Sequence, residues 1–287
     1  MQEIVSVDIL IANYNNSEYL DSFFESIAKS TKLPKNIIFV DDCSIDDSVL
    51  KVKKTVIRNV NIKLIKLNKN IGFANALNEG LKFIDSEYVL RIDPDDILHP
   101  ERIESQLKEF RKNPILDIVG SNVVYFKDVI QNVMGKSNFP IDHNDIKTQY
   151  INGNHGLCHG ALMIKSNCFL DNKYKQESFP AEEYDIFSRM INSGKLTLNL
   201  PENLTYVRIH HESVSNEMPI STVIKTFKLR EKHFDIKTSK TKIKIEHVRR
   251  KYYRKFLYTD YKYRYLLLLV VIILSPSRLI KRLKKKN

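Results

Sequence analysis

Apolar and polar residues follow one another along the first 110 residues in blocks that fit strands and helices in turn. Short, mostly apolar runs predict strands at 4–11, 36–40, 62–67 and 88–92. Between these runs, apolar residues recur at three- and four-residue spacing, which predicts helices near 19–27, 49–56, 74–84 and 100–110. Strands that alternate with helices in this way are typical of a parallel sheet covered on both faces. We therefore expect an α/β fold.

A polar cluster directly follows three of the predicted strands. The clusters are Asn13 to Asn15, Asp41 with Asp42, and the acidic run from Asp93 to Asp96. In an open α/β sheet the ligand crevice lies beyond the carboxyl ends of the strands. All three clusters should therefore open onto one crevice.

The pattern changes after residue 120. Further strands are predicted at 119–126 and 161–164, and a helix that begins with acidic residues is predicted at 182–191. The stretch from 127 to 160 is rich in Asn, Asp, His and Gly, which is typical of a binding-loop region.

The net charge of +12 is unevenly distributed. From Lys225 to Asn287 there are 21 Lys and Arg against 4 Asp and Glu, a net +17, which leaves −5 for the preceding residues. A mildly acidic main part does not favour nucleic acid, so we expect no nucleic-acid partner. The basic tail is a physically separate region.

The three cysteines, Cys43, Cys158 and Cys168, form no CxxC pair. An odd number of unpaired thiols fits a reduced, cytosolic setting. A zinc site built from His155, Cys158 and His159 would lack a fourth ligand and a recognised spacing, which disfavours it.

Asp93, Asp95 and Asp96 place three like charges within four positions, close to Arg91. Such crowding raises carboxyl pKa values and destabilises a fold unless a positive group lies among the charges. Hard oxygen ligands at a strand end suit Mg²⁺ or Mn²⁺ held partly by a substrate phosphate. A solvated acidic loop that caps a helix is the alternative, and this motif alone does not exclude it.

Six segments in a fixed order carry a more specific signal than any one of them. They read ILIANYNNSEYLDSFFESI, IIFVDDCSIDDS, NKNIGFANALNEGL, YVLRIDPDDILHPERIESQ, AEEYDIFSRM and YVRIHHESVS. In this order and spacing the chain, from about Val5 to Ser215, resembles family 2 glycosyltransferases. The resemblance implies an inverting enzyme that uses a nucleotide-diphospho-sugar. It also implies a GT-A fold, in which a Rossmann-like, mostly parallel central sheet carries helices on both faces.

The resemblance implies a donor site at the strand ends. Its nucleotide-sugar-binding residues would be Ala12, Tyr14, Asn15, Asp42, Asn70, Gly72, Asn75, Asn78, Arg91, Asp93 and Asp95. Asp42 would accept a hydrogen bond from uracil, although it could instead cap the next helix. Gly72 and Asn70 could equally serve a tight turn and a left-handed backbone position. The family's usual proline before the Tyr-Asn pair is missing, and Cys43 stands where glycine is common.

The same resemblance implies a cofactor cation, Mn²⁺ or Mg²⁺, held by Asp95, Asp96 and His210. His210 belongs to a segment that continues with the spaced serines Ser213 and Ser215. A neutral imidazole suits a place near a metal or a diphosphate, and a plain structural histidine is the alternative.

Glu183 matches the acid that deprotonates the acceptor hydroxyl as this hydroxyl attacks the anomeric carbon. Aspartate is usual at this place, so Glu183 reaches one methylene further. The acceptor-binding residues would be His155, His159, Glu182 and Arg189. Acids at a helix start are also favoured by the helix dipole, which is the alternative explanation for Glu182 and Glu183.

Tyr265 to Leu274 is an uncharged run of ten residues. A bilayer-spanning helix needs roughly 20 residues, so this run is too short to cross a membrane. A buried core helix is one interpretation, but the basic and tyrosine-rich flanks favour a helix that lies in a membrane interface. We therefore expect residues 221–287, which are helical and basic, to bind an anionic membrane surface. This would make the protein peripheral on the cytoplasmic face of the cell membrane.

The resemblance implies a glycosyltransferase domain at 1–220, with a nucleotide-sugar-binding half at 1–120 and an acceptor-binding half at 121–220. It also implies that the donor is a UDP-hexose or UDP-N-acetylhexosamine, and that the acceptor is a glycan or lipid-linked hydroxyl in bacterial surface polysaccharide biosynthesis. A sugar-phosphate nucleotidyltransferase is one alternative, but it would need a glycine-rich, basic loop that ANYNNSEYL lacks. A non-catalytic glycan-binding or scaffold protein is another, but it would be expected to have lost the carboxylates.

Overall fold

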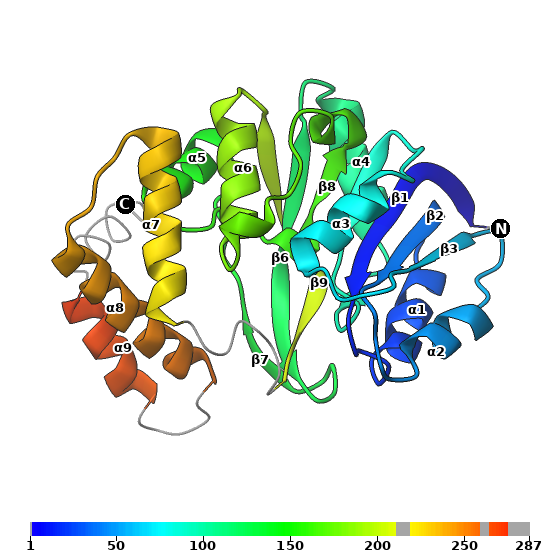
Figure 1. The fold of residues 1–287 in the computed structure, drawn as a ribbon, viewed down its shortest axis with the longest axis horizontal. Coiled ribbons are helices and arrows are strands. Elements are labelled where there is room, and N and C mark those ends of the chain that lie inside the picture. Colours follow the sequence, from blue (N-terminus) through cyan, green and yellow to red (C-terminus); the bar gives the residue numbers. More distant parts are fainter. Residues whose placement is uncertain (1, 211–218, 259–263, 275–287) are drawn as a thin grey trace. The chain divides into compact units, whose positions relative to one another are not determined.

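The computed structural model describes residues 2–210, 219–258 and 264–274. Its contacts divide the chain into two compact units, Met1–Arg208 and Ile209–Asn287 (Figure 1). Ser213 and Ser215 lie outside the described residues, as do 259–263 and 275–287 of the tail. The predicted division at residue 220 assigns roles to two parts of the chain, and those roles remain predictions.

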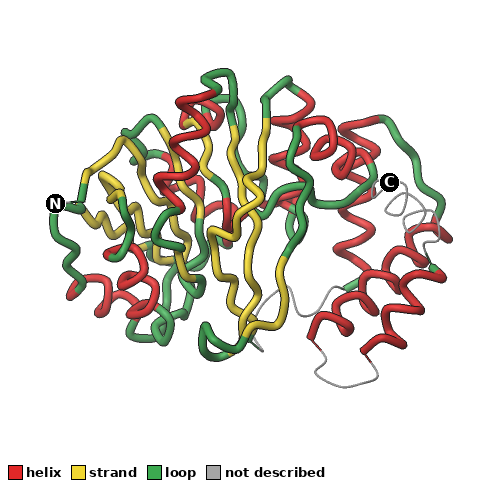
Figure 2. The backbone as a smooth tube through the Cα atoms, turned by 180° about the vertical axis from the view of Figure 1, so that it is seen from behind, coloured by secondary structure: helices red, strands yellow, loops and turns green. Residues whose placement is uncertain are grey.

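Within the described residues the strands form one nine-stranded sheet, drawn in yellow in Figure 2. The strands are β1 (Glu3–Asn13), β2 (Lys32–Asp41), β3 (Asn61–Lys66), β4 (Tyr88–Arg91), β5 (Ile97–Leu98), β6 (Ile118–Lys127), β7 (Val133–Lys136), β8 (Met163–Lys165) and β9 (Thr197–Ile209). Their order in the sheet is β3-β2-β1-β4-β8-β6-β9-β5, and β7 pairs with β6.

The sheet is parallel where β3, β2, β1 and β4 lie side by side, as the alternation of strands and helices predicts. The pairs β4–β8, β6–β8, β6–β7 and β5–β9 are antiparallel. A short turn can join antiparallel neighbours such as β6 and β7, whereas parallel neighbours need a longer crossover, usually a helix. The sheet is therefore mixed, and the expected parallel sheet is its first half.

Helices cover both faces of the parallel half, as predicted. The helices of the first unit are α1 (Leu20–Ala28), α2 (Ser48–Lys54), α3 (Phe73–Leu81), α4 (Arg102–Lys112), α5 (His143–Ile151) and α6 (Glu182–Asn192). Successive strand side chains point to opposite faces. Ile9 joins a core with Phe23 of α1 and Phe110 of α4, and each such buried side chain contributes about 1.5–3 kcal/mol. On the other face Gly80 of α3 lies so close that an added Cβ would be 2.4 Å from Leu10 Cδ1.

One α-helix and three strands of the first unit were not predicted, and their sequences explain why. In α5 only Ile146 and Tyr150 are buried, so the helix has no apolar stripe. In β9 the exposed Pro201 and Glu202 interrupt the apolar pattern. β5 and β7 are short, at 2 and 4 residues.

The second unit is mainly helical where it is described. It contains α7 (Ile220–Phe234), α8 (Lys240–Tyr258) and α9 (Arg264–Ile273), coloured from yellow to red in Figure 1. α8 packs against both α7 and α9. In the ranges 2–210, 219–258 and 264–274, no helix has both the length and the apolar character needed to cross a bilayer.

Candidate functional site

Hydrogen bonds join the carboxyl ends of β1 and β2. The Asn13 amide side chain donates to Asp41 Oδ2 and to Ser44 Oγ, each over 3.1 Å. The backbone N–H of Asp42 donates to the Asn13 carbonyl over 2.8 Å. The backbone N–H of Asn15 donates to Ser44 Oγ over 3.0 Å. The first two polar clusters therefore lie together at this edge of the sheet.

Asp42, the residue expected to bind uracil, holds a neighbouring loop. Its Oδ1 accepts a hydrogen bond from the Ile71 N–H over 2.7 Å, and its Oδ2 accepts one from the Gly72 N–H over 2.9 Å. The residue is only 3% exposed. Asp42 therefore shapes the loop before α3, while α2 begins after Asp47. A contact between Asp42 and a nucleotide base remains a prediction.

The loop before α3 depends on Gly72. Gly72 has a positive φ of 87°, so a residue with a side chain would be strained there, and its Cβ would also displace the end of the Gln176 side chain, 2.6 Å away at Nε2. Asn70 is not left-handed. Its side-chain oxygen instead accepts a hydrogen bond from the Gly72 N–H over 3.2 Å. Asn75 donates to the Ile71 carbonyl over 2.9 Å, which fixes the first turn of α3.

The remaining donor-side residues of β1 and β2 differ in exposure and backbone conformation. Ala12 is buried in β1, whereas the Tyr14 side chain is 48% exposed. Asn15 and Cys43 both have left-handed backbones, with φ of 56° and 66°. Cys43 thus adopts the conformation that favours the glycine common at this place in the family.

Arg91 is a buried cation at the end of β4. Its guanidinium forms an ion pair with Asp93 and donates to the Ile92 carbonyl. It lies 5.1 Å from the ring centre of Phe73, the first residue of α3. Burial is the largest single influence and acts to lower the pKa of Arg91, but Asp93, Tyr174 and Glu183 together outweigh it, so this pKa is raised and the charge is retained. Arg91 therefore links the acidic cluster to the start of α3.

Asp96 is the buried member of the acidic cluster. Burial, followed by the charges of Asp95 and Asp93, raises its pKa well above the ordinary value. Its Oδ1 accepts a hydrogen bond from the Arg208 N–H over 2.9 Å, and Arg208 Nε donates to the Asp95 carbonyl over 2.9 Å. A Cβ added at Gly160 would lie 3.2 Å from Asp96 Oδ2 and 3.3 Å from Asp93 Oδ2. Two carboxylate oxygens thus converge on the bare backbone of Gly160.

The chemistry of this cluster fits a divalent cation. Carboxylate oxygens are the ligands that Mg²⁺ and Mn²⁺ prefer, and a cation would relieve the like-charge crowding that raises the pKa of Asp96. Among the described residues, no three His, Cys, Asp or Glu side chains converge closely enough to hold a metal ion by themselves. His210 follows β9 and belongs to the second unit, so its place as a metal ligand remains a prediction.

Glu183, the predicted base, lies at the start of α6 and makes a hydrogen bond to His159. Glu183 Oε1 is 3.0 Å from His159 Nδ1, and the Glu183 side chain is 36% exposed. Burial acts to raise the pKa of Glu183, but His159, His155 and Arg91 outweigh it and lower this pKa to about 2. The carboxylate is therefore ionised at neutral pH and accessible to a hydroxyl, as a general base requires.

Besides His159, the neighbours of Glu183 include two more of the predicted acceptor-side residues. Burial and the charge of Glu183 raise the pKa of Glu182 to about 7, and Glu182 is 8% exposed. His155 is exposed, and its ring centre lies 6.3 Å from that of Tyr150 and 5.8 Å from that of Tyr184. The structure thus gathers His155, His159 and Glu182 around Glu183.

The fourth predicted acceptor-binding residue, Arg189, makes its hydrogen bonds away from Glu183. Six residues on from Glu183, it is turned by roughly 240° around the helix. Its guanidinium donates to Asp185 Oδ2 over 3.0 Å, to Asn172 Oδ1 over 3.2 Å and to the Lys173 carbonyl over 2.6 Å. Arg189 therefore fastens the 172–173 segment to α6, and the structure does not bring it to Glu183.

Arg102, which the sequence did not single out, connects the segments that form the site. It is fully buried, and burial lowers its pKa to about 9. Its guanidinium donates to Gln106 Oε1, Thr205 Oγ1 and the carbonyl oxygens of Arg91, Gly160 and Leu162, at 2.7–3.2 Å. Arginine supplies five donors in one plane, so a single side chain can satisfy all of these acceptors. The only sequence signal was the place of Arg102 in the segment that follows the acidic cluster.

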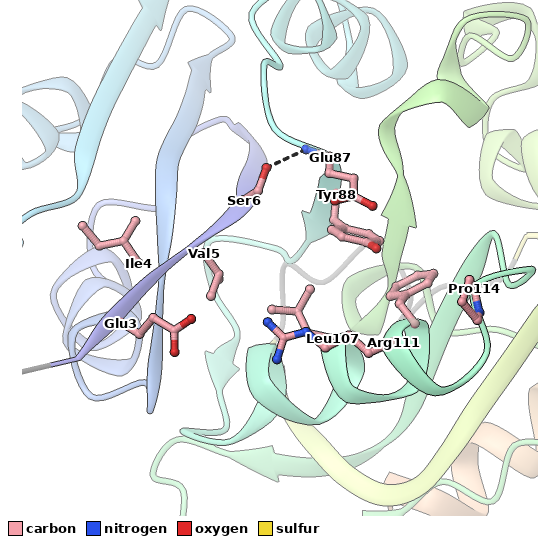
Figure 3. Close-up of a pocket in the computed structure, with 10 residues that line it drawn as sticks. Glu3, Ile4, Val5, Ser6, Glu87, Tyr88, Leu107, Arg111 and Pro114 are labelled. Atoms are coloured by element: carbon pink, nitrogen blue, oxygen red, sulfur yellow. Dashed lines mark hydrogen bonds between the residues drawn. The ribbon is translucent and has the colours of Figure 1, made fainter.

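Figure 3 shows a pocket that lies away from these residues. It has a volume of about 470 Å³ and is lined by Glu3 to Ser6 at the start of β1, by Tyr88 at the start of β4, and by Arg111 of α4. The Glu87 N–H closes one side with a 3.0 Å hydrogen bond to Ser6 Oγ. The pocket is at the amino ends of the strands and contains none of the predicted site residues.

Known proteins are similar to this chain in sequence and in fold. The amylovoran biosynthesis glycosyltransferase AmsE of Erwinia amylovora is 27% identical over 209 residues, which are 72% of this chain and 77% of AmsE. The S. aureus TarS fragment 1–349 in complex with UDP-GlcNAc superposes with a TM-score of 0.63 and 16% identity, over 96% of this chain and 80% of that fragment. A mannosyltransferase from Pyrobaculum calidifontis, in complex with GDP-Man and Mn²⁺, has a TM-score of 0.56 and 12% identity, over 93% of this chain and 69% of that one.

At such low identity the two structures show the fold alone, which is the expected GT-A fold. The sequence family is shown by a direct match to its model, described as glycosyl transferase family 2, over residues 8–169. The chain therefore belongs to glycosyl transferase family 2.

Proposed function

We propose that this protein is an inverting glycosyltransferase in which Glu183 is the general base. The sugar would come from a UDP-hexose or UDP-N-acetylhexosamine and pass to a hydroxyl of a glycan or lipid-linked acceptor in surface polysaccharide biosynthesis. Glu183 would take the proton of this hydroxyl as its oxygen attacks the anomeric carbon. The attack comes from the face opposite the leaving diphosphate, so an α-linked donor gives a β-linkage.

The observation that carries this proposal is the turn at His159 and Gly160. His159 binds the predicted base, Glu183, over 3.0 Å. The next residue, Gly160, abuts the carboxylates of Asp93 and Asp96. An ionised, accessible base and the acidic cluster therefore contact adjacent residues of one turn. Displacement of a diphosphate by a hydroxyl requires these two groups on opposite sides of one sugar.

A divalent cation would be held by Asp95 and Asp96, with Mn²⁺ or Mg²⁺ as the cofactor. When bound, it would neutralise charge that develops on the departing diphosphate. Arg91, which keeps its charge while buried beside Asp93, holds this carboxylate in place. His210 would complete the ligand set.

The named relatives support the substrate classes of the proposal. TarS was crystallised with UDP-GlcNAc, and the Pyrobaculum mannosyltransferase with GDP-Man and Mn²⁺. These complexes support a nucleotide-diphospho-sugar donor and a divalent cation. AmsE is named for the biosynthesis of amylovoran, which supports a polysaccharide acceptor.

A panel of nucleotide-sugars tests the proposal. Turnover of one donor should require Mn²⁺ or Mg²⁺, and Glu183→Gln should lower kcat by roughly 10²–10⁴-fold because the base is lost. Glu202→Gln, an exposed position in β9, is the matched control and should retain full activity. Turnover that is equally fast in Glu183→Gln, or UDP binding that ignores the metal in calorimetry, would contradict the proposal.

We also propose that the basic tail attaches the protein to the cytoplasmic face of the membrane. In α9, four large apolar side chains share one face and are each more than half exposed, namely Tyr265, Leu266, Leu269 and Ile273. The preceding helix α8 is rich in Lys and Arg. Each basic residue near an anionic surface adds about 1 kcal/mol of attraction. An exposed apolar face next to this charge supports binding in the membrane interface.

Co-sedimentation with vesicles tests the attachment. The double variant Leu266→Asp/Leu269→Asp should lose most of its binding to phosphatidylglycerol vesicles, because two charges would enter the apolar layer. Leu170→Asp is a matched control, since Leu170 is 75% exposed in the first unit. Equal binding by the double variant and this control would rule out α9 as the membrane contact.

A further inference from the structure

We propose that His159 and Tyr174 are positioning residues that hold the Glu183 carboxylate, and that Asn78 extends this hydrogen-bonded chain to the donor-side helix α3. The inference rests on the proposed role of Glu183 as the base. It assigns a role to Tyr174, which no sequence pattern singled out. It also gives His159 a task different from binding the acceptor.

Four side chains form this chain of hydrogen bonds, and it spans the site. Asn78 of α3 binds the backbone of Tyr174 twice, donating to its carbonyl over 2.8 Å and accepting from its N–H over 2.9 Å. The Tyr174 hydroxyl lies 2.7 Å from His159 Nε2. His159 Nδ1 lies 3.0 Å from Glu183 Oε1. An amide on the donor-side helix is thus connected to the base on α6.

The chemistry of the partners fixes the direction of these hydrogen bonds. An ionised Glu183 can only accept, so His159 Nδ1 must carry the hydrogen. His159 Nε2 can then accept the hydrogen of the Tyr174 hydroxyl. Burial raises the pKa of Tyr174, so this hydroxyl keeps its hydrogen and remains a donor. Each donor in the chain therefore meets an acceptor.

Aromatic rings keep the imidazole of His159 in one orientation. Its side chain is 2% exposed. The ring centres of Phe73, Tyr174 and Phe187 lie 5.9, 5.5 and 5.7 Å from that of His159. They come from α3, the loop before α6, and α6 itself. Rotation of the imidazole would clash with these rings, so the Nδ1–H keeps its aim at Glu183.

In this arrangement the two carboxylate oxygens of Glu183 have different partners. Oε1 is held by His159, while Oε2 makes no hydrogen bond among the described residues and belongs to a side chain that is 36% exposed. Oε2 is therefore the atom left for the acceptor hydroxyl. A carboxylate on a freely rotating glutamate would present this oxygen only part of the time. Second-sphere partners of this kind are typically worth 10–100-fold in metal sites.

Other charged and titratable groups also face Glu183, so the contribution of His159 must be separated from theirs. These groups are His155, Arg91, Glu182, Cys158, Tyr150 and Tyr174. His155 and Arg91 also lower the pKa of Glu183. Their effect on this pKa would remain in a His159 variant. The test therefore changes only His159 or the Tyr174 hydroxyl and measures Glu183 directly.

The first measurement is a carbon NMR titration of the full-length chain labelled at the glutamate carboxyl carbon, with Glu183→Gln used to assign the signal. In the wild type the Glu183 signal should stay ionised from pH 4 to 8, because its pKa is about 2. In His159→Phe, whose ring fills the space among the aromatic side chains but offers no donor, we expect this pKa to rise by about one unit or more, since only His155 and Arg91 then oppose the effect of burial. In His159→Asn, whose amide N–H can replace Nδ1–H, the restored hydrogen bond should lower this pKa again relative to His159→Phe.

The second measurement is turnover of the nucleotide-sugar that the wild type uses. His159→Phe should lower kcat by roughly 10–100-fold and leave the donor KM within about twofold, since it changes the aim of the base and not the donor site. Tyr174→Phe keeps its ring and loses only the hydroxyl, so we expect a smaller loss, of about threefold to tenfold. Tyr88→Phe, at the opposite end of the sheet, is the matched tyrosine control and should behave as the wild type.

The two proposals can fail separately. An inactive Glu183→Gln together with a fully active His159→Phe whose Glu183 still titrates near 2 would overturn the positioning role alone. Fully active Glu183→Gln would overturn the proposed base, and the titration would still decide whether His159 holds the carboxylate. If His159→Phe does not fold, Tyr174→Phe decides the matter through the same titration and the same split between kcat and KM.

Discussion

Cys43 occupies a backbone conformation that glycine adopts without strain. Its φ of 66° lies in the left-handed region, where a Cβ costs roughly 1–2 kcal/mol. Glycine would remove this cost but would make the unfolded chain more flexible, which offsets about 0.4–1 kcal/mol. The residue follows Asp42, so its conformation helps to set where the carboxylates of the turn point.

We predict that Cys43→Gly raises the free energy of unfolding by roughly 0.5 kcal/mol, the difference between these two terms. Cys43→Ala removes the sulfur but keeps the Cβ, and should not be stabilised. Urea denaturation of both variants measures the effect. A stabilised Cys43→Ala with an unchanged Cys43→Gly would show that the sulfur, and not the backbone, is responsible.

Glu182 is a buried acid next to an ionised one. Its pKa is raised from 4.5 to about 7, with burial as the larger cause and the charge of Glu183 as the next. The folded state therefore binds the Glu182 proton more tightly than the unfolded state does. This contribution to stability is fully present below pH 4.5 and is lost as the pH rises towards 7.

We predict that Glu182→Gln is more stable than the wild type at pH 8, by at most about 3 kcal/mol, because it carries no charge to bury. The advantage should shrink as the pH is lowered to 5. Thermal unfolding at both pH values measures the difference, with Glu202→Gln as an exposed control. An advantage of equal size at both pH values would show that burial of the charge is not the cause.

At the scale of elements, the loop before α3 is held by one carboxylate. Asp42 accepts both of its hydrogen bonds from the backbone N–H groups of Ile71 and Gly72. Leaving a buried N–H without a partner costs about 1–3 kcal/mol. The position of α3, and with it Asn78 and Phe73, therefore depends on the end of β2.

We predict that Asp42→Ala lowers hydrogen-exchange protection of the Ile71 and Gly72 amides by roughly tenfold or more, while the core of the sheet stays protected. UDP affinity should fall with it. Asp42→Asn keeps one acceptor oxygen and should give an intermediate loss. Unchanged protection in Asp42→Ala, together with lost UDP binding, would instead make Asp42 a nucleotide contact that does not organise the loop.

The elements that could be predicted from sequence were those with a strong local period. The buried strands β1, β2, β3 and β4 and the amphipathic helices between them have such a period. β9 was missed because Pro201 and Glu202 interrupt its pattern, and α5 was missed because it buries few residues. The antiparallel half follows from long-range pairing, such as that of β4 with β8, which no local pattern encodes.

At the scale of the whole molecule, the candidate-site residues that could be predicted are those for which both the residue type and its place in the fold gave a signal. Asp42, Asp96 and Glu183 are acids placed at strand ends or a helix start, so both their type and their place gave a signal. Tyr174 and Arg102 act through the backbone groups and side chains that the fold brings to them. Nothing in their immediate sequence says which groups these are. The roles of the predicted residues toward donor, acceptor and metal remain predictions.

The charge distribution also belongs to this scale. The mildly acidic first part and the basic tail of +17 are parts of one chain, so an anionic surface would attract one region and repel the other. The charge distribution therefore favours contact of such a surface with the tail over contact with the first part.

The contacts of Arg102 have a consequence for how the protein acquires its site. One guanidinium is satisfied only when chain positions near 91, 160–162 and 205 have all arrived around it. These positions are far apart in the sequence, and such long-range contacts are slow to form during folding. The acidic cluster, the His159–Gly160 turn and β9 should therefore assemble together and late in folding. A chain that ends before β9 would contain the carboxylates of the site, but they would not be in their native positions.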